Sequence, residues 1–265
     1  MKVFISADIE GISTTCKWEE TEKGHPSYPL HATRMTDEVL AVIRGAKSAG
    51  ATQITVRDAH DSATNIDPLR MPDGVRLIRN WSGHPYSMVD GIDSDYDAVL
   101  FVGYHSAASV VGNAMSHTMN TRNTMVRING RLASEFMIHC YAAALEGVPS
   151  VFLAGDKALC ESEKELSPYL VTVAEKEGRD ELTICYPPAE VLESLKAGAQ
   201  KALNQDLKSA LIKLPESFKL EISYKDHNKA YKASFYPGVR RVNSTSVVFE
   251  NENYFEILRT ISFIL

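Results

Sequence analysis

The chain begins with Met1-Lys-Val-Phe-Ile-Ser-Ala-Asp-Ile-Glu-Gly-Ile-Ser13. Its apolar run from Val3 to Ala7 predicts a short buried strand. Asp8 and Glu10 follow at once, and Gly11 allows the backbone to turn. Because residues two apart on an extended chain point the same way, the two carboxylates can converge at the end of this strand. The segment therefore predicts either a metal cradle or a strand end with two solvated acids.

A strand–helix–strand pattern follows this first segment. After Pro29, apolar residues recur at helical spacing as far as Gly50, which suits a helix end. Gln53–Val56 is typical of a short strand, and His60 follows it. Such a unit predicts two parallel strands joined by a right-handed crossover. Ligands of parallel sheets gather at the carboxyl ends of the strands, where His60 would join the two acids of the first segment.

Further residues that can bind a metal ion follow later predicted elements. Ala98–Val102 is a fully apolar strand that runs towards His105. A loop rich in small and polar residues then carries His117. Ser134 is expected to cap a helix that has Glu135 in its first turn. Several predicted strands thus end in metal-binding residue types, which scattered surface residues would not explain.

The order of the predicted elements indicates an α/β protein with a mostly parallel sheet flanked by helices and a smaller α+β C-terminal part. We expect residues 1–187 to form a metal-binding catalytic α/β domain. Residues 188–265 are expected to form a smaller α+β region packed on it, starting with a long helix over residues 189–211. Asn129-Gly130 predicts a tight hairpin turn within the first region.

The composition excludes several classes of protein. Hydrophobic residues make up 44% of the chain, charged residues 23%, and the net charge is −6, as in ordinary globular proteins. The acidic balance argues against nucleic acid or an anionic membrane as the main partner. The sequence contains neither a membrane-spanning apolar stretch nor a cleavable leader, so we expect a cytoplasmic protein. The cysteines are scattered and predict reduced thiols: Cys16, Cys140, Cys160 and Cys185.

Six residues form the candidate site by their place at the ends of predicted elements: Asp8, Glu10, His60, His105, Glu135 and, beside them, His117. Imidazole and carboxylate groups are ligands of zinc and similar divalent ions. Without His117 there are five such ligands, which is more than one catalytic ion needs. Five ligands suit two ions bridged by one carboxylate. Taken singly, each has an ordinary explanation, such as a polar strand end or an acid favoured by a helix dipole.

Other polar residues near these positions are expected to be secondary. Asp58 and Asp61 flank His60 and would either orient its ring as hydrogen-bond acceptors or be solvated. The remaining histidines are expected to be structural or exposed: His25, His31, His84, His139 and His227.

The motifs resemble those of the D-aminopeptidase (DppA) family, which is peptidase family M55. The resemblance covers about the first 160 residues in order and spacing, and it extends more loosely to the C-terminus. It rests on five segments: Ser6–Ser13, Asp58-Ala-His60, Gly103-Tyr-His105, Met115-Ser-His117 and the helix-start Glu135. Each motif is weak alone, but the set is specific.

The resemblance implies a di-zinc exopeptidase that removes N-terminal D-residues, D-Ala above all, from short peptides. It also implies a homo-oligomeric ring, often a decamer of two pentameric rings. Asp8 would bridge the two ions. The two sites would be completed by two pairs of ligands: Glu10 with His60, and His105 with Glu135. His117 would have the catalytic role, acting on the hydrolytic water or stabilising the oxyanion.

Some features depart from the family pattern and leave substrate choice open. Ser134 stands where the family usually has glycine, and the stretch from His105 to His117 is a residue longer. A metal-dependent hydrolase of another bond, an amidase or a phosphoesterase, would also fit these residues, although the chain has no glycine-rich phosphate loop. So would a non-catalytic metal- or peptide-binding protein, or a purely structural metal site.

Overall fold

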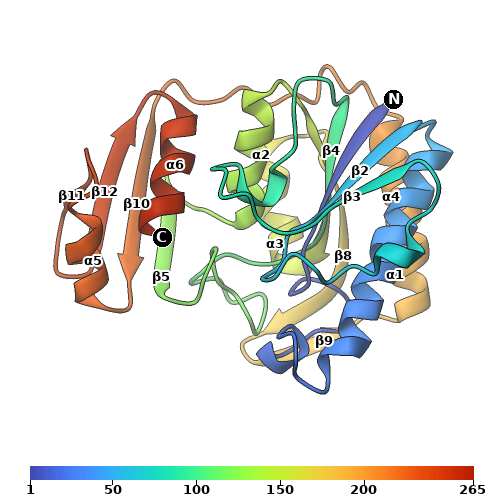
Figure 1. The fold of residues 1–265 in the computed structure, drawn as a ribbon, viewed down its shortest axis with the longest axis horizontal. Helices are drawn as coiled ribbons and strands as arrows, with labels where there is room; N and C mark the ends of the chain where they lie inside the picture. The colour runs from blue at the N-terminus through green and yellow to red at the C-terminus, as the bar shows by residue number, and fades with distance from the viewer.

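The computed structural model describes all residues from 1 to 265 and contains two sheets (Figure 1). The larger sheet has seven strands in the order β3-β2-β1-β4-β7-β8-β9. These strands are β1 (Lys2–Ala7), β2 (Gln53–Asp58), β3 (Val75–Ile78), β4 (Ala98–Tyr104), β7 (Ser150–Asp156), β8 (Val171–Arg179) and β9 (Leu182–Cys185). All neighbours are parallel except β8 and β9. The predicted α/β class with a mostly parallel sheet is confirmed.

The middle of this sheet is made of strands that are apolar on both faces. Every residue of β4 is buried, and so is β1 from Val3 onwards. Alternate side chains of β1 enter two different cores, with Val3 and Ile5 on one side and Phe4 on the other. Continuous apolar strands of this kind suit a parallel sheet that is covered by helices on both faces.

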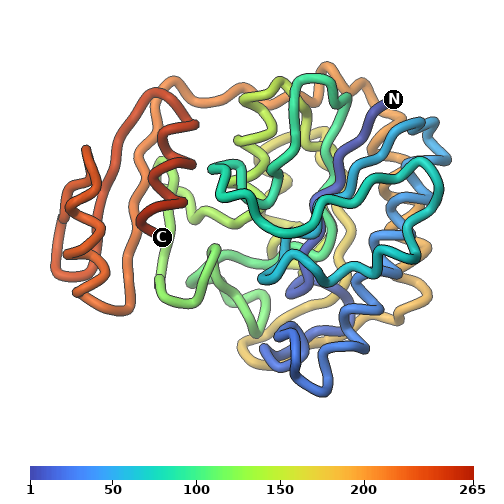
Figure 2. The backbone as a smooth tube through the Cα atoms, viewed as in Figure 1, coloured from blue at the N-terminus to red at the C-terminus, as the bar shows by residue number.

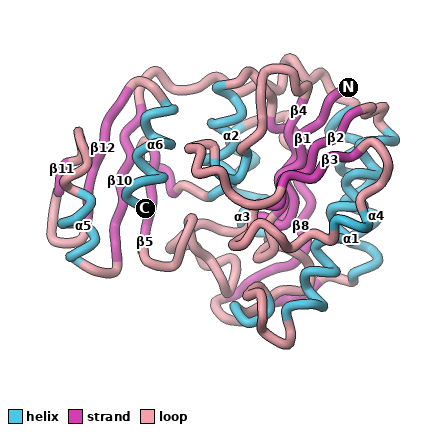
Figure 3. Tube along the Cα trace, viewed as in Figure 1, coloured by secondary structure: helices cyan, strands magenta, loops and turns pink.

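Helices cover both faces of the larger sheet, as Figure 3 shows. On one face lie α1 (Tyr28–Ser48) and α4 (Pro188–Leu203). On the other face lie α2 (Glu135–Leu145) and α3 (Lys157–Glu163). No helix combines the length and the apolar character that a membrane crossing requires. The short 3-10 turns are η1 (Trp18–Glu20), η2 (Pro68–Arg70), η3 (Ser87–Val89) and η4 (Lys164–Leu166).

The second sheet is antiparallel and has the order β11-β12-β10-β5-β6. Its strands are β5 (Asn123–Ile128), β6 (Arg131–Leu132), β10 (Phe218–Tyr224), β11 (Arg240–Arg241) and β12 (Ser246–Asn251). Asn129 and Gly130 both have positive φ and join β5 to β6. This confirms the predicted hairpin, because a type I′ turn needs positive φ at both central residues.

Helix α6 (Tyr254–Ile264) connects the two sheets. Alternate residues of β10 are buried, and Phe218 packs on Tyr254 of α6 with ring centroids 4.8 Å apart. The Tyr254 hydroxyl donates a hydrogen bond of 3.0 Å to the carbonyl of Ile138 in α2. Helix α5 (His227–Ala233) contacts β10 and β12. The second sheet is thereby attached to the helix that starts with Glu135.

The division of the chain at residue 187 stays a prediction. Helix α4, from the C-terminal part, covers the larger sheet, while the β5–β6 hairpin lies beside β10 in the second sheet (Figure 2). The helix predicted over residues 189–211 is shorter than expected and ends at Leu203. Just beyond this end, the Gln205 side-chain amide donates to the carbonyl of Ala202 in the last turn and to that of Tyr169, which satisfies a carbonyl that the helix leaves free.

A buried acid lies between β8 and α1. Glu175 is fully buried, neither of its carboxyl oxygens accepts a hydrogen bond, and its carboxyl group faces that of Glu38. Burial and the neighbouring Glu38 carboxylate raise the pKa of Glu175 well above its ordinary value. Glu38 itself accepts hydrogen bonds from Ser13 and Arg34. The folded protein therefore favours a neutral, protonated Glu175.

We predict that Glu175→Gln stabilises the protein at neutral pH. The unfolded chain loses this proton near pH 4.5, whereas the folded protein keeps it to higher pH. Wild-type stability should therefore fall as pH rises above that value, by at most about 1.4 kcal/mol per pH unit from this group. Glutamine has no proton to lose, so the variant should lack this slope in thermal unfolding between about pH 4 and 8. Glu181→Gln, at an exposed site, is the control, and identical slopes in all three proteins would contradict the explanation.

Candidate metal centre

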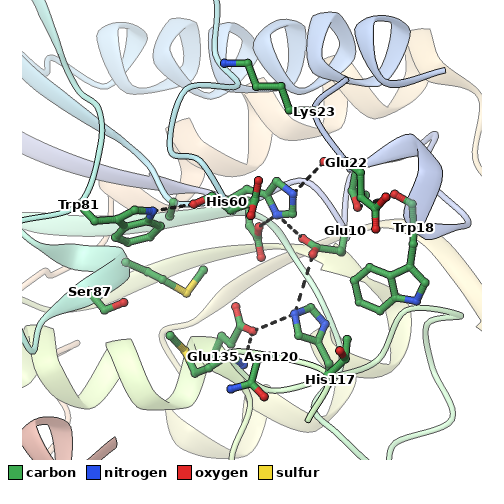
Figure 4. A pocket seen from close by; sticks show the side chains of 17 residues that line it. Glu10, Trp18, Glu22, Lys23, His60, Trp81, Ser87, His117, Asn120 and Glu135 are labelled. Carbon is green, nitrogen blue, oxygen red and sulfur yellow. Dashed lines mark hydrogen bonds and ion pairs between the residues drawn. The ribbon is translucent and has the colours of Figure 1, made fainter. Parts of the chain in front are cut away.

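The carboxyl ends of the central parallel strands meet at one edge of the larger sheet, and the predicted site residues gather there. Figure 4 shows Glu10, His60, His117 and Glu135 among them. They come from separate elements: Asp8 and Glu10 after β1, His60 after β2, His105 after β4, His117 from the loop beyond it, and Glu135 from the first turn of α2. The structure brings all six together.

Asp8, Glu10 and His60 form the first group. His60 Nδ1 lies 3.0 Å from Glu10 Oε2 and 3.3 Å from Asp8 Oδ1. All three residues are buried, and one potential ligand atom of each lies within 4.8 Å of the others. This group can hold one metal ion.

Asp8 also belongs to a second group, with His105 and Glu135. His105 Nε2 lies 3.5 Å from Asp8 Oδ2 and 3.4 Å from Glu135 Oε1. The two oxygen atoms of Asp8 thus face different histidines, His60 and His105. A carboxylate with this placement can contact two ions at once.

His117 lies at the border between the buried groups and the cavity. Its Nε2 is 3.5 Å from Glu135 Oε1 and 3.9 Å from Glu10 Oε1. Its ring stacks on His105 with centroids 4.2 Å apart, and the edge of Trp18 packs against it. Glu10, His105 and His117 form a third group of potential ligands.

Backbone carbonyls hold the three imidazole rings. The nitrogen that faces away from the site donates in each case: His60 Nε2 to Thr21 at 3.0 Å, His105 Nδ1 to Ser106 at 3.0 Å, and His117 Nδ1 to Met115 at 2.9 Å. These bonds leave the nitrogens that face the site available to bind either a proton or a metal ion. Metal-binding histidines commonly have such outer hydrogen bonds.

The acids beside His60 do not orient its ring. Asp58 is buried and accepts from the backbone of Asn65 and Ile66, so it holds the loop that follows β2. Asp61 is exposed, in agreement with the expectation of a solvated acid. The ring is held instead by the carbonyl of Thr21, a role that side-chain chemistry in the sequence could not reveal.

The pKa values of the site residues are strongly shifted. Burial, with the adjacent Glu10, raises the pKa of Asp8 well above its ordinary value. Burial opposes ionisation of Glu10 and Glu135 too, but the facing imidazoles lower both pKa values, to about 2 for Glu135. Burial works against charged imidazoles, yet the carboxylates raise the pKa of His60 and bring that of His105 to about 10. Protons and metal ions therefore compete for the same imidazole nitrogens.

The chemistry of the buried atoms fits metal ions. Glu10 Oε2 and His105 Nε2 are both buried and have no hydrogen-bond partner of acceptable geometry. Buried polar atoms are rarely left in this state unless an ion or a functional role accounts for them. Imidazole nitrogen and carboxylate oxygen are the donor atoms that zinc and similar divalent ions prefer.

A cavity of about 780 Å³ opens above these residues, with Trp18 and Trp81 on either side (Figure 4). A second cavity of about 310 Å³ adjoins it. The two share four lining residues: Trp81, Ser87, Met119 and Asn120. The second cavity therefore lies next to the first.

The sequence interpretation missed the role of Trp81. Its ring lies over the Arg57 guanidinium at 4.3 Å, and its indole nitrogen donates to the carbonyl of Asp61 at 2.6 Å. These contacts fix an aromatic wall beside His60. Trp81 follows the strand Val75–Ile78, so the rule that ligands collect at strand ends could have selected it.

Comparison with known proteins agrees with this geometry. The D-aminopeptidase family model matches residues 1–263. The D-aminopeptidase of Bacillus subtilis (strain 168) is 30% identical over 258 residues, which cover 97% of this chain and 93% of that relative. A solved structure, that of the Zn-dependent D-aminopeptidase DppA from Bacillus subtilis, "a self-compartmentalizing protease", superimposes with a TM-score of 0.92 at 28% identity. The superposition covers 98% of this chain and 95% of the other.

The fold and these relatives define the class of protein, a metallopeptidase hydrolase. Within that class, the chain belongs to the D-aminopeptidase family, peptidase family M55. The resemblance drawn from the sequence motifs is confirmed, and it extends over almost the whole chain.

Proposed function

We propose that this chain is a di-zinc aminopeptidase that removes the N-terminal residue of short peptides, with D-Ala-containing peptides or amides as its substrates. The observation that carries the proposal is the position of Asp8, whose two oxygens face His60 and His105 separately. Membership of the D-aminopeptidase family supports the type of reaction, and the Zn-dependent relative supports the metal.

Each ion would have its own pair of ligands besides the shared Asp8. Glu10 and His60 would hold one, and His105 and Glu135 the other. Support comes from the grouping of the donor atoms, which lie within 4.8 Å of one another in each set. When bound, a pair of divalent ions activates a water molecule and polarises the carbonyl of the bond to be cleaved.

His117 is the proposed catalytic residue. Its side chain is 12% exposed, against 10% for His60 and 0% for His105, and it lines the cavity. Burial and the stacked His105 lower the pKa of His117, so its ring is neutral at physiological pH. A neutral imidazole held through Nδ1 can accept a proton from the attacking water at Nε2. The resulting imidazolium can stabilise the oxyanion or return the proton to the leaving amine.

The shape of the cavities supports a peptide as the substrate. The second cavity lies next to the space beside His117, shares Trp81 and Asn120 with it, and has apolar residues such as Ile138 and Leu258 in its lining. A residue beyond the cleaved bond can occupy this second space. Preference for the D-configuration rests on the family and on the named relative.

We also propose a homo-oligomer, a decamer of two pentameric rings, in the cytoplasm. The related structure is that of a self-compartmentalizing protease, which supports an assembly of several copies. Sedimentation equilibrium should then give the mass of ten chains. A mass of one or two chains at micromolar concentration would contradict the ring.

Substitution of single ligands should separate the two ions. Because Asp8 contacts both groups, Asp8→Asn should reduce the zinc content by more than one ion per chain. His60→Ala should remove only the ion held with Glu10, since His105 and Glu135 are unchanged. Elemental analysis at a buffered free-zinc concentration measures both, with the exposed His25→Ala as control. Equal zinc loss in Asp8→Asn and His60→Ala would contradict the bridging role.

Hydrolysis of paired D-Ala and L-Ala amides and dipeptides tests the reaction itself. The zinc-loaded protein should release D-Ala and lose activity with a chelator. His117→Ala should lower kcat by roughly 10²–10⁴-fold with unchanged zinc content, because only proton transfer is removed. The exposed His227→Ala is the control.

Each different result of this assay points to a definite function. Turnover of the L-series alone would refute the stereochemical part. Activity on p-nitrophenyl phosphate without peptide cleavage would favour a phosphoesterase. Zinc binding without turnover of any of these substrates would favour a binding protein or a structural metal site.

A further inference from the structure

Lys176 on β8 is fully buried directly behind the candidate metal centre. Its ammonium donates to three oxygen atoms of one segment: the carbonyl of Glu10, the carbonyl of Thr15 at 2.6 Å, and Thr15 Oγ1 at 3.0 Å. These partners are carbonyl and hydroxyl oxygens rather than a carboxylate. Glu10 therefore contacts Lys176 through its backbone carbonyl and His60 through its carboxylate.

A β-bulge brings Lys176 to this position. In the pairing of β7 with β8, Gly155 lies opposite Ala174 and Asp156 lies opposite Lys176, so Glu175 is an extra residue. Glu175 and Lys176 are both fully buried although they are adjacent. Bulges occur beside functional sites, where they redirect a side chain.

Asn113 holds the same carbonyl from the opposite loop. Its Nδ2 donates to the Glu10 carbonyl at 3.0 Å and to Asp156 Oδ2 at 3.3 Å. The loop lies against β8 at Gly178, where an added Cβ would come within 2.3 Å of the Gly112 carbonyl. Strand β8 therefore supports both residues that donate to the Glu10 carbonyl. It carries Lys176 itself, and it packs closely against the loop that carries Asn113.

Asp156 extends the network to the second group of candidate ligands. Its carboxylate accepts from the backbone nitrogen and the hydroxyl of Ser106, both at 2.6 Å. The Ser106 carbonyl in turn accepts from His105 Nδ1 at 3.0 Å. A continuous series of hydrogen bonds thus joins the backbone of Glu10 to the ring of His105.

A contribution to folding stability does not by itself account for the buried ammonium of Lys176. Burial of an ammonium is costly, and the oxygens that Lys176 contacts are uncharged, so no close ion pair offsets this cost. Metal centres, by contrast, need ligands held within about half an ångström by their supporting residues. All the oxygens that Lys176 holds lie in the segment that carries Glu10.

We propose that Lys176 is a positioning residue for the metal centre: together with Asn113 and Asp156, it fixes the backbone that presents Glu10 and His105 to the ions. This inference rests on the proposed metal-binding roles of Glu10 and His105. It assigns Lys176 no contact with the substrate or the ions.

Lys176→Met tests the proposal, because it keeps the length of the side chain and removes its three hydrogen bonds. Zinc affinity, measured by competition with a chromophoric chelator, should fall by about 10–100-fold. The metal-free protein should stay folded, with at most a small fall in its unfolding temperature from the oxygens left without a donor. Lys157→Met is the matched control, since Lys157 is 42% exposed and pairs with Glu177 on the same strand, away from Glu10. It should change neither quantity.

Asn113→Ala gives a second test, because it removes the other donor to the Glu10 carbonyl. It should weaken zinc binding, and its effect should not add to that of Lys176→Met, since both act on one group. Additive losses of zinc affinity would overturn the shared role. So would unchanged zinc affinity in Lys176→Met, or a loss matched by an equal destabilisation of the metal-free protein.

The same measurements keep this inference apart from the proposed function. A wild-type protein that binds zinc tightly, depends on Lys176 for that binding and cleaves no peptide would refute the aminopeptidase and support the positioning role. An active peptidase whose zinc affinity does not change in Lys176→Met would support the aminopeptidase and refute the positioning role. A wild-type protein that binds no zinc would refute both.

Discussion

The structure depends on the convergence of three carboxylates, Asp8, Glu10 and Glu135, in a buried space. Like charges this close repel one another, and burial makes each charge harder to hold. The facing imidazoles of His60 and His105 offset this repulsion in the absence of a metal, and divalent ions can do so when bound. The elements around the site hold these carboxylates and imidazoles at fixed positions.

The fold meets this need by bringing rigid elements to one point. Parallel strands present their carboxyl ends at a common edge, and α2 contributes Glu135 from its first turn, where the helix dipole favours a negative charge. The backbone nitrogen of Met119 donates to Glu135 at 2.7 Å, and α6 holds α2 against the second sheet. This arrangement explains how 28% sequence identity is compatible with a TM-score of 0.92 to the Bacillus subtilis structure. Apolar patterning and a few polar positions specify the geometry, and most surface residues are free to vary.

Much of the site could be predicted because its signals are local. An apolar strand followed by Asp8 and Glu10 is visible in the sequence, and so are His60 and His105 at the ends of later strands. Topology rules then place these ends together without coordinates. The parallel sheet followed from the same patterns, because buried central strands are continuously apolar.

The sequence by itself therefore determined the fold class, the family and the six residues that meet at the centre. Only the tertiary structure decided which groups support them. The Glu-Lys-Glu run around Lys176 has the composition of a solvated surface, yet Glu175 and Lys176 are fully buried at the bulge opposite β7, while Glu177 stays partly exposed. The β5–β6 hairpin likewise joins β10 through pairing with a strand about 90 residues away, which no local pattern encodes. Local preferences act over a few residues, whereas burial and strand pairing depend on neighbours distant in sequence.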